Sequence, residues 1–230
     1  MPPGLPASLP SARSILDRHV AAIGGRETLL RYNSRHAKGT YSVPSTGISG
    51  ALDWYTAKPN KSLLKVSLTG VGDVVEGFDG TYGWNLSAVT GPMLLAGTEL
   101  EERRLDSDFN SELTHESRYS SITTVEQTQF AGRPCYKVRL ARKAGTEDIE
   151  FYDVSTGLKA GSTRTRHSQM GAVTRTEILE DYRKFGGVAH PTTMKTQGLV
   201  QAVITIATIE YDSVSPSLFE LPPAIRAQVK

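Results

Sequence analysis

The stretch Ile48-Ser49-Gly50-Ala51-Leu52-Asp53-Trp54-Tyr55-Thr56-Ala57 lies between two turn-forming runs, Pro44-Ser45-Thr46-Gly47 and Lys58-Pro59-Asn60. Alternating side chains with turn residues at both ends are typical of a β-strand between tight turns. The same pattern recurs from Ser34 almost to the C-terminus. It predicts a meandering antiparallel sheet of about ten strands, which must curl because sheets twist. A curled sheet has an inner face, and the function depends on what fills it.

Three segments break the strand pattern and predict helices. Ser11 can cap a helix over residues 12–23, which Gly24-Gly25 would end. A short helical turn over residues 26–32 leads into the sheet. Midway along the chain, Thr98 and Glu101 form a capping box that opens a helical insertion. The expected strands are residues 34–43, 48–57, 61–68, 73–78, 81–87, 121–130, 135–142, 147–154, 158–168, 173–185, 189–197 and 200–211.

The composition fits a single domain that is thin or hollow. Of the 230 residues, 38% are hydrophobic, which is low for a tightly filled core. We expect residues 1–10 to form a flexible linker and residues 11–230 to form one domain with a helical insertion near 98–118. The net charge of +2 gives no electrostatic basis for binding nucleic acid. No apolar run is long enough to predict a transmembrane helix.

Large apolar side chains recur on one face of several expected strands. Because side chains alternate between faces, Leu52 and Trp54 share a face, and so do Leu64 and Val66. The insertion adds a narrow stripe at every fourth residue. We predict that these residues line a ligand-binding cavity: Leu52, Trp54, Leu64, Val66, Leu68, Phe78, Tyr82, Trp84, Leu86, Leu105, Phe109 and Leu113. The alternative is that they fill a solid core.

A set of short motifs, ordered along most of the chain, resembles the outer-membrane lipoprotein-sorting family, which includes the periplasmic lipoprotein carrier LolA. The motifs are the run from Ile15 to Glu27, Lys38-Gly39-Thr40, Phe78-Asp79-Gly80 with Trp84, Tyr152-Asp153 with Thr156-Gly157-Leu158, Asp181-Tyr182 with Gly186-Gly187 and Pro191, and Phe219-Glu220-Leu221-Pro222. The resemblance implies a mainly β, α+β fold: a strongly curved antiparallel half-barrel with an N-terminal helix and a helical lid on its concave side. It also implies an apolar cavity that takes acyl chains. The compact, charge-rich insertion departs from the family.

The residues indicate no catalytic or metal chemistry, so we expect neither enzymatic activity nor a cofactor. The histidines lack the helical spacing of a metal site, and the nucleophile-elbow and dinucleotide-binding glycine motifs are absent. Glu76 is expected on the same face as Val74 and Phe78, where burial would raise its pKa unless a salt bridge or solvent stabilises the charge. The single cysteine, Cys135, excludes an internal disulfide and is expected to be a buried strand thiol.

The sequence therefore favours non-catalytic binding and carriage of an apolar ligand, a lipid or the acyl chains of a lipoprotein, by a monomer. The alternative is a protein-interaction or sensor subunit that uses the same scaffold in a larger envelope assembly. The expected partners are a lipid or acylated protein and another envelope protein. The resemblance implies a periplasmic location, with a signal sequence removed ahead of Met1.

Overall fold

The computed structural model describes residues 8–143, 146–168 and 171–229. Its helical elements are α1 (Ala12–Ala22), α2 (Gly25–Arg31), α3 (Gly97–Asp106), η1 (Ser111–Leu113), α4 (His115–Arg118), η2 (Pro216–Phe219) and α5 (Pro223–Arg226). Its strands are β1 (Ser34–Val43), β2 (Ile48–Ala57), β3 (Lys61–Leu68), β4 (Gly72–Phe78), β5 (Gly83–Ser87), β6 (Gly91–Leu94), β7 (Tyr119–Phe130), β8 (Arg133–Arg142), β9 (Glu147–Asp153), β10 (Lys159–Ser168), β11 (Gly171–Glu180), β12 (Arg183–Phe185), β13 (Val188–His190), β14 (Thr193–Gln197) and β15 (Ala202–Tyr211). Within the described residues, no helix has the length and apolar character needed to cross a membrane.

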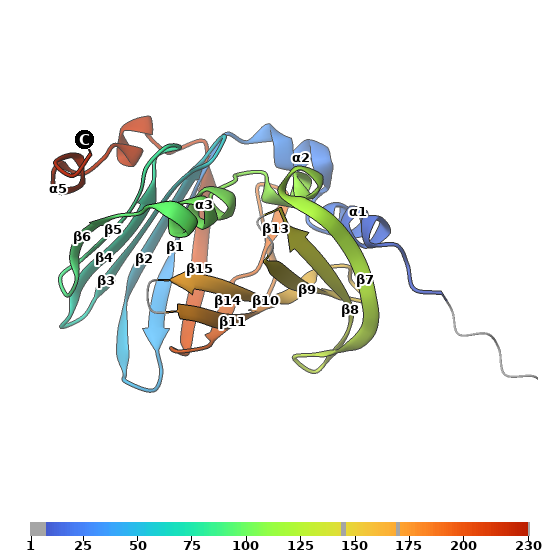
Figure 1. Ribbon diagram of the computed structural model, residues 1–230. Coiled ribbons are helices and arrows are strands. Elements are labelled where there is room, and N and C mark those ends of the chain that lie inside the picture. The colour runs from blue at the N-terminus through green and yellow to red at the C-terminus, as the bar shows by residue number, and fades with distance from the viewer. Residues whose placement is uncertain (1–7, 144–145, 169–170, 230) are drawn as a thin grey trace, which may run out of the picture.

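Thirteen strands form one antiparallel sheet that curves strongly without closing, as the sequence predicts (Figure 1). Its order is β6-β5-β4-β3-β2-β1-β15-β14-β11-β10-β9-β8-β7, and β12 and β13 form a separate hairpin. The first and last strands of the sheet in the chain, β1 and β15, pair at its centre. The two edge strands, β6 and β7, are consecutive in the sequence. The segment that joins them must therefore pass from one edge of the half-barrel to the other.

That joining segment is the predicted helical insertion, and we call residues 97–118 the lid segment. Its helix α3 contacts both β5 and β10, which belong to opposite halves of the sheet (Figure 1). The Ser107 hydroxyl lies 2.7 Å from the Ser62 hydroxyl on β3, and the Phe109 backbone N–H donates to the Pro59 carbonyl at 3.1 Å. The lid segment thus lies across the concave side of the sheet.

The concave side is partly filled by an apolar cluster on the central strands. Buried Leu52 of β2, Val66 of β3 and Ile206 of β15 belong to it, and Trp54 and Leu64 pack against it. A second concave cluster joins Ile15 and Leu16 of α1 to the inner face of β8. The N-cap of α1 is as predicted, since the Ser11 side chain accepts from the Ser14 backbone N–H. The prediction of a hollow sheet is therefore correct only in part, because apolar side chains fill much of the concave face.

The convex face has its own apolar cluster, covered by the C-terminal segment. Trp84 and Leu63 are buried there against Phe219 of η2 and Ile225 of α5. Gly77, which pairs with Trp84 across β4 and β5, leaves room for the indole, since a Cβ atom would lie 2.2 Å from the ring. The prediction that Trp84 and Leu86 share a face with Leu52 and Trp54 is wrong, because the register between β3, β4 and β5 places them on the opposite face.

Most predicted boundaries are confirmed to within two residues, with three differences. Strand β6 was not expected. The expected strands over 173–185 and 189–197 are each interrupted, and the hairpin of β12 and β13 lies between β11 and β14. Thr98 does not cap α3, which starts at Gly97 after Ala96 and has no side-chain cap.

Candidate functional site

A cavity of about 310 Å³ lies between the concave face of the sheet and the lid segment. Its lining includes residues of α1, the lid segment and both halves of the sheet. One wall is apolar and the other is charged, so the cavity is amphipathic.

The apolar wall comes from the central strands. It is formed by Ala37, Trp54, Leu179, Met194, Ile206 and Ile209. From the opposite side, Phe109 and Leu113 of the lid segment also face the cavity. Apolar side chains on both sides of a cavity, even a partly open one, remove much of the surface of an alkyl chain from water.

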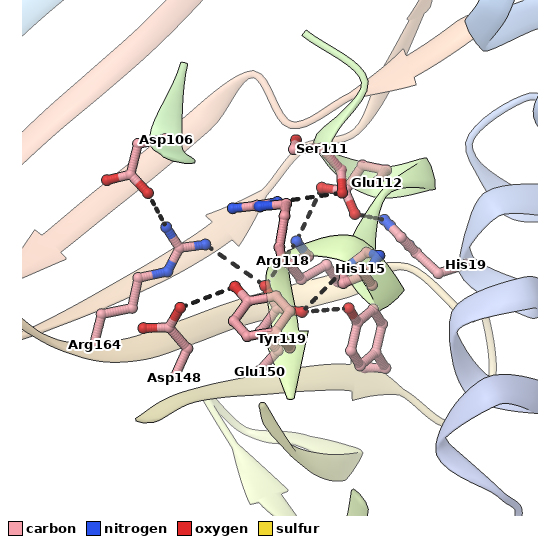
Figure 2. Close-up of polar contacts among 12 residues, drawn as sticks. His19, Asp106, Ser111, Glu112, His115, Arg118, Tyr119, Asp148, Glu150 and Arg164 are labelled. Carbon is pink, nitrogen blue, oxygen red and sulfur yellow. Dashed lines mark hydrogen bonds and ion pairs between the residues drawn. The ribbon is translucent and has the colours of Figure 1, made fainter. Parts of the chain in front are cut away.

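The charged wall comes from β9 and β10, beneath the lid segment (Figure 2). Glu150 is 2% exposed and accepts from Lys159 at 3.2 Å, with Arg164 at 3.5 Å from the same carboxylate. His115 of α4 lies 3.8 Å from Glu150. This wall therefore carries charged groups at a place where solvent hardly reaches the Glu150 carboxylate.

A second carboxylate on β9 is also buried. Asp148 is fully buried and accepts from the Arg142 guanidinium at 2.8 Å and from the Tyr119 hydroxyl at 2.9 Å. Figure 2 shows Asp148, Glu150 and Arg164 grouped below Asp106 of α3. Buried charges persist only where partners offset the loss of solvent, and these groups supply one another.

The charged wall is in its ionised state. Burial by itself would raise the pKa of Glu150, but the charge of Lys159 and the hydrogen bond with His115 outweigh it and hold the pKa well below its ordinary value. Burial, together with the charges of Glu150 and Glu112, raises the pKa of Tyr152. At neutral pH the carboxylate is therefore charged and the phenol keeps its proton. Within the described residues, no group of three histidine, cysteine or carboxylate side chains could hold a metal ion.

Ion pairs attach the lid segment to the sheet. Glu112 of η1 accepts from Lys159 at 2.9 Å and lies 3.5 Å from the His19 ring on α1 (Figure 2). Asp106 lies 3.5 Å from Arg164. At the other end of the lid segment, Arg103 donates to Glu76 at 2.9 Å. Glu76 is thus neutralised by a salt bridge, the alternative left open by the sequence.

The structure separates the predicted ligand-binding residues into four groups. Three of them line the cavity, namely Trp54, Phe109 and Leu113. Four belong to the adjoining apolar cluster on the same face, namely Leu52, Leu64, Val66 and Leu68. Two lie on the convex face, namely Trp84 and Leu86. The remaining three are Phe78, which is fully buried at the end of β4, Tyr82 in the turn before β5, and Leu105 in α3.

The charged wall was not predicted from the sequence, because the alternation in β9 does not tell which of its two faces lies inward. Asp148 and Glu150 alternate with Ile149 and Phe151, and carboxylates in a strand are ordinarily placed on its solvent face. In the structure β9 is buried on both faces, and Phe151 stacks on Phe130 at 3.9 Å on the outer side. The alternation is real, but it does not say which face is inside when both are covered.

Comparisons with known proteins identify the fold. No family model matches the chain, and no curated protein matches it. Among solved structures, a DUF1329 family protein from Desulfovibrio piger has a TM-score of 0.61 at 12% identity, covering 91% of this chain and 97% of that one. A LolA superfamily protein from Nitrosomonas europaea has a TM-score of 0.57 at 12% identity, covering 93% and 99%. A domain described as outer membrane lipoprotein-sorting, from Vibrio parahaemolyticus, has a TM-score of 0.55 at 9% identity, covering 90% and 94%.

Proposed function

We propose that this chain, which has the LolA-like fold that its motifs predict, binds an amphiphile with an apolar chain in the cavity under the lid segment. The amphiphile is a lipid or an acylated protein. The protein carries this ligand within a bacterial envelope compartment, the periplasm, as a monomer and without chemical change. The observation that supports the proposal most directly is the apolar wall facing Phe109 and Leu113 across a partly open cavity. The names of two similar structures, LolA superfamily and lipoprotein-sorting domain, support the same ligand class.

The cavity volume limits what the closed form can hold. At about 310 Å³ the cavity is at the lower end of the range of about 300–1,000 Å³ that is usual for ligand sites. A short alkyl chain fits such a space, whereas a long acyl chain or a lipid with several chains requires the lid segment to move. The lid segment is attached mainly by ion pairs and hydrogen bonds, which can break without exposing a large apolar surface.

The charged wall supports binding rather than catalysis. A general acid or base is most effective when its pKa lies near the operating pH. Here Glu150 is held as a carboxylate by Lys159, and Tyr152 is held as a neutral phenol. Paired groups of this kind fix the shape of the charged wall and the position of the lid segment above it.

A binding titration with a matched pair of variants tests the proposal. The protein is stripped of lipid and titrated with an apolar dye whose fluorescence rises in apolar surroundings. Ile209→Asp places a charge in the apolar wall, and the control Thr208→Asp places the same charge on the neighbouring, exposed residue of β15. We expect the wild-type protein and Thr208→Asp to bind the dye, and Ile209→Asp to lose binding while its circular dichroism spectrum stays native.

Native mass spectrometry of the protein purified from a bacterial envelope gives the second measurement. A co-purifying lipid or acylated peptide supports carriage. If the stripped wild-type protein binds no dye and no acyl chain, or if Ile209→Asp binds as well as Thr208→Asp, the proposal is wrong. The protein-interaction alternative would then lead.

A further inference from the structure

One corner of the cavity holds a cation with an unusual environment. Arg35, at the start of β1, pairs across the sheet with Thr56 of β2 on one side and Tyr211 of β15 on the other. All three side chains line the cavity. Directly opposite side chains in an antiparallel pair have Cβ atoms about 4.5–5.5 Å apart, so the three lie side by side.

No ion pair joins Arg35 to a carboxylate of the described residues, in contrast to the cations on β8 and β10 beneath the lid segment. Arg142, Lys159 and Arg164 each pair with at least one carboxylate. The Arg35 guanidinium instead lies 5.7 Å from the centre of the Trp54 ring and 3.4 Å from Nδ1 of His190. Burial lowers the pKa of Arg35, and the interaction with Tyr211 opposes this shift without cancelling it. A half-buried cation that contacts only neutral side chains is stabilised when an anion joins it.

His190 is neutral and cannot be that counter-charge. Burial and the charge of Arg35 lower its pKa to about 3. Because Arg35 can only donate, Nδ1 of His190 accepts, and the ring proton lies on Nε2. Nε2 is 2.6 Å from the Tyr211 hydroxyl, so the imidazole donates to the hydroxyl oxygen. The phenolic proton of Tyr211 is then directed away from His190 and is available to another acceptor.

Thr56 provides a third donor in the same corner. It is 6% exposed, and its hydroxyl has no hydrogen-bond partner among the described residues. A buried hydroxyl without a partner costs free energy, as an unpaired cation does. Arg35, Thr56 and Tyr211 thus all have N–H or O–H groups that an oxygen anion in the cavity could accept from.

The apolar wall begins next to these donors. Ala37 lies two residues after Arg35 on β1 and on the same face, and it pairs with Ile209 of β15. Trp54, two residues from Thr56 on β2, pairs with Ala37 from the other side. A ligand with an anionic end in the corner would therefore place its chain directly on apolar side chains.

We propose that the corner formed by Arg35, Thr56 and Tyr211 binds the anionic headgroup, a carboxylate or a phosphate, of the amphiphile whose chain lies on the apolar wall. This inference rests on the proposed function and specifies its ligand class: acidic amphiphiles in preference to neutral ones of the same chain length.

The test compares three probes that share one chain: oleate, oleyl alcohol and oleoyl lysophosphatidate, each below its micellar concentration. We expect the wild-type protein to bind an acidic probe at least about tenfold more tightly than oleyl alcohol, because charge-assisted hydrogen bonds replace the lost solvent. Preference for oleate alone identifies a carboxylate site, preference for lysophosphatidate alone identifies a phosphate site, and either result supports the inference.

The variants separate charge recognition from chain binding. Arg35→Gln should bring the affinities for oleate and oleyl alcohol close together by weakening oleate alone, and Arg35→Lys should restore part of the preference. The control Arg139→Gln removes a half-exposed arginine from β8 that pairs with Glu147 and should change neither affinity. If Arg35→Gln does not fold, Thr56→Val is the second variant, since it removes the hydroxyl with little change of shape and should weaken oleate only.

The outcomes distinguish the two proposals. Equal affinity of the wild-type protein for oleate, lysophosphatidate and oleyl alcohol would overturn the headgroup site and leave chain binding intact. If Arg35→Gln or Thr56→Val lowers the affinity for oleyl alcohol as much as the affinity for oleate, the headgroup site would also be overturned. The residue would then maintain the shape of the cavity and would not recognise the charge. Failure of all three probes to bind would overturn both proposals.

Discussion

The lid segment should open at a lower free energy than the sheet unfolds. Its side chains belong to none of the four buried apolar clusters of the described residues. Its attachments are ion pairs such as Glu112–Lys159 and Arg103–Glu76, together with a few hydrogen bonds. Seven residues of the lid segment make these attachments, namely Arg103, Asp106, Ser107, Phe109, Glu112, His115 and Glu116. At roughly 0.5–1 kcal/mol each, they give an opening free energy on the order of 3.5–7 kcal/mol. Global unfolding of a domain costs about 5–15 kcal/mol.

The substitution Glu112→Gln tests whether these attachments set the free energy of lid opening. Lys159 keeps its ion pair with Glu150 at 3.2 Å, so the substitution leaves no buried charge unpaired. The loss is one charge-assisted hydrogen bond exchanged for a neutral one, about 1 kcal/mol, or about fivefold in the opening equilibrium. Since Glu112 makes its ion pairs only in the closed native state, the variant should lower the free energies of lid opening and of global unfolding equally.

Native-state amide hydrogen exchange, read residue by residue, is the assay. In the wild-type protein, residues 98–118 should exchange faster than β15, the central strand. The matched control is Leu63→Ala, on the convex face. It should lower the protection of β15 by about 2–5 kcal/mol and leave the lid segment unchanged, because Leu63 stays packed when the lid opens. Protection of the lid segment equal to that of β15, or a Leu63→Ala effect of equal size on both, would refute the reasoning.

Three further predictions follow from single residues. Phe219→Ala should lower the free energy of unfolding in urea by about 3–5 kcal/mol, because Phe219 is 1% exposed against Trp84. Its oleate affinity should stay at the wild-type value, and a loss of binding with the fold intact would contradict the convex-face assignment. Because the pKa of His190 is lowered to about 3 while the unfolded chain protonates near 6.5, stability should fall as pH drops from about 6.5 toward 3, by up to about 1.4 kcal/mol per pH unit. In urea titrations, His190→Asn should reduce the dependence of the unfolding free energy on pH between about 6.5 and 3. An unchanged dependence would contradict the assignment of this loss of stability to His190. The Cys135 thiol is fully buried and burial raises its pKa, so it should react with a thiol reagent only as fast as the protein opens; rapid labelling of the native state would disprove this.

The hairpin meander could be predicted because its signals are local. Turn residues and alternation fix where β1, β2 and β3 begin and end, and all three match the prediction at both ends. Which face of a strand lies inward is a long-range property. Trp84 was placed on the wrong face because the register between β4 and β5, and the tail that covers it, cannot be seen in either strand alone.

The cavity could be predicted only in part for the same reason. Trp54, Phe109 and Leu113 were found because large apolar residues on a covered face are a local signal. Arg35, Thr56 and Tyr211 lie far apart in the sequence and meet only because β1 pairs with β2 on one side and β15 on the other. Each of them alone is an ordinary strand residue, so no pattern in the sequence marks the corner.

The topology explains why binding and lid closure should be coupled. Because β6 and β7 are the two edges of the sheet, the chain between them has to cross the open side, and it carries Phe109 and Leu113 into the cavity. A chain lying on the apolar wall contacts these two side chains only when the lid segment is closed. Such a ligand stabilises the closed state over the open one, by about 2.7 kcal/mol at a hundredfold excess over its dissociation constant if the open state binds nothing. Without ligand, the ion pairs keep the lid segment closed but allow it to open, so a ligand can enter. The bound ligand then adds the apolar contacts that the lid segment lacks.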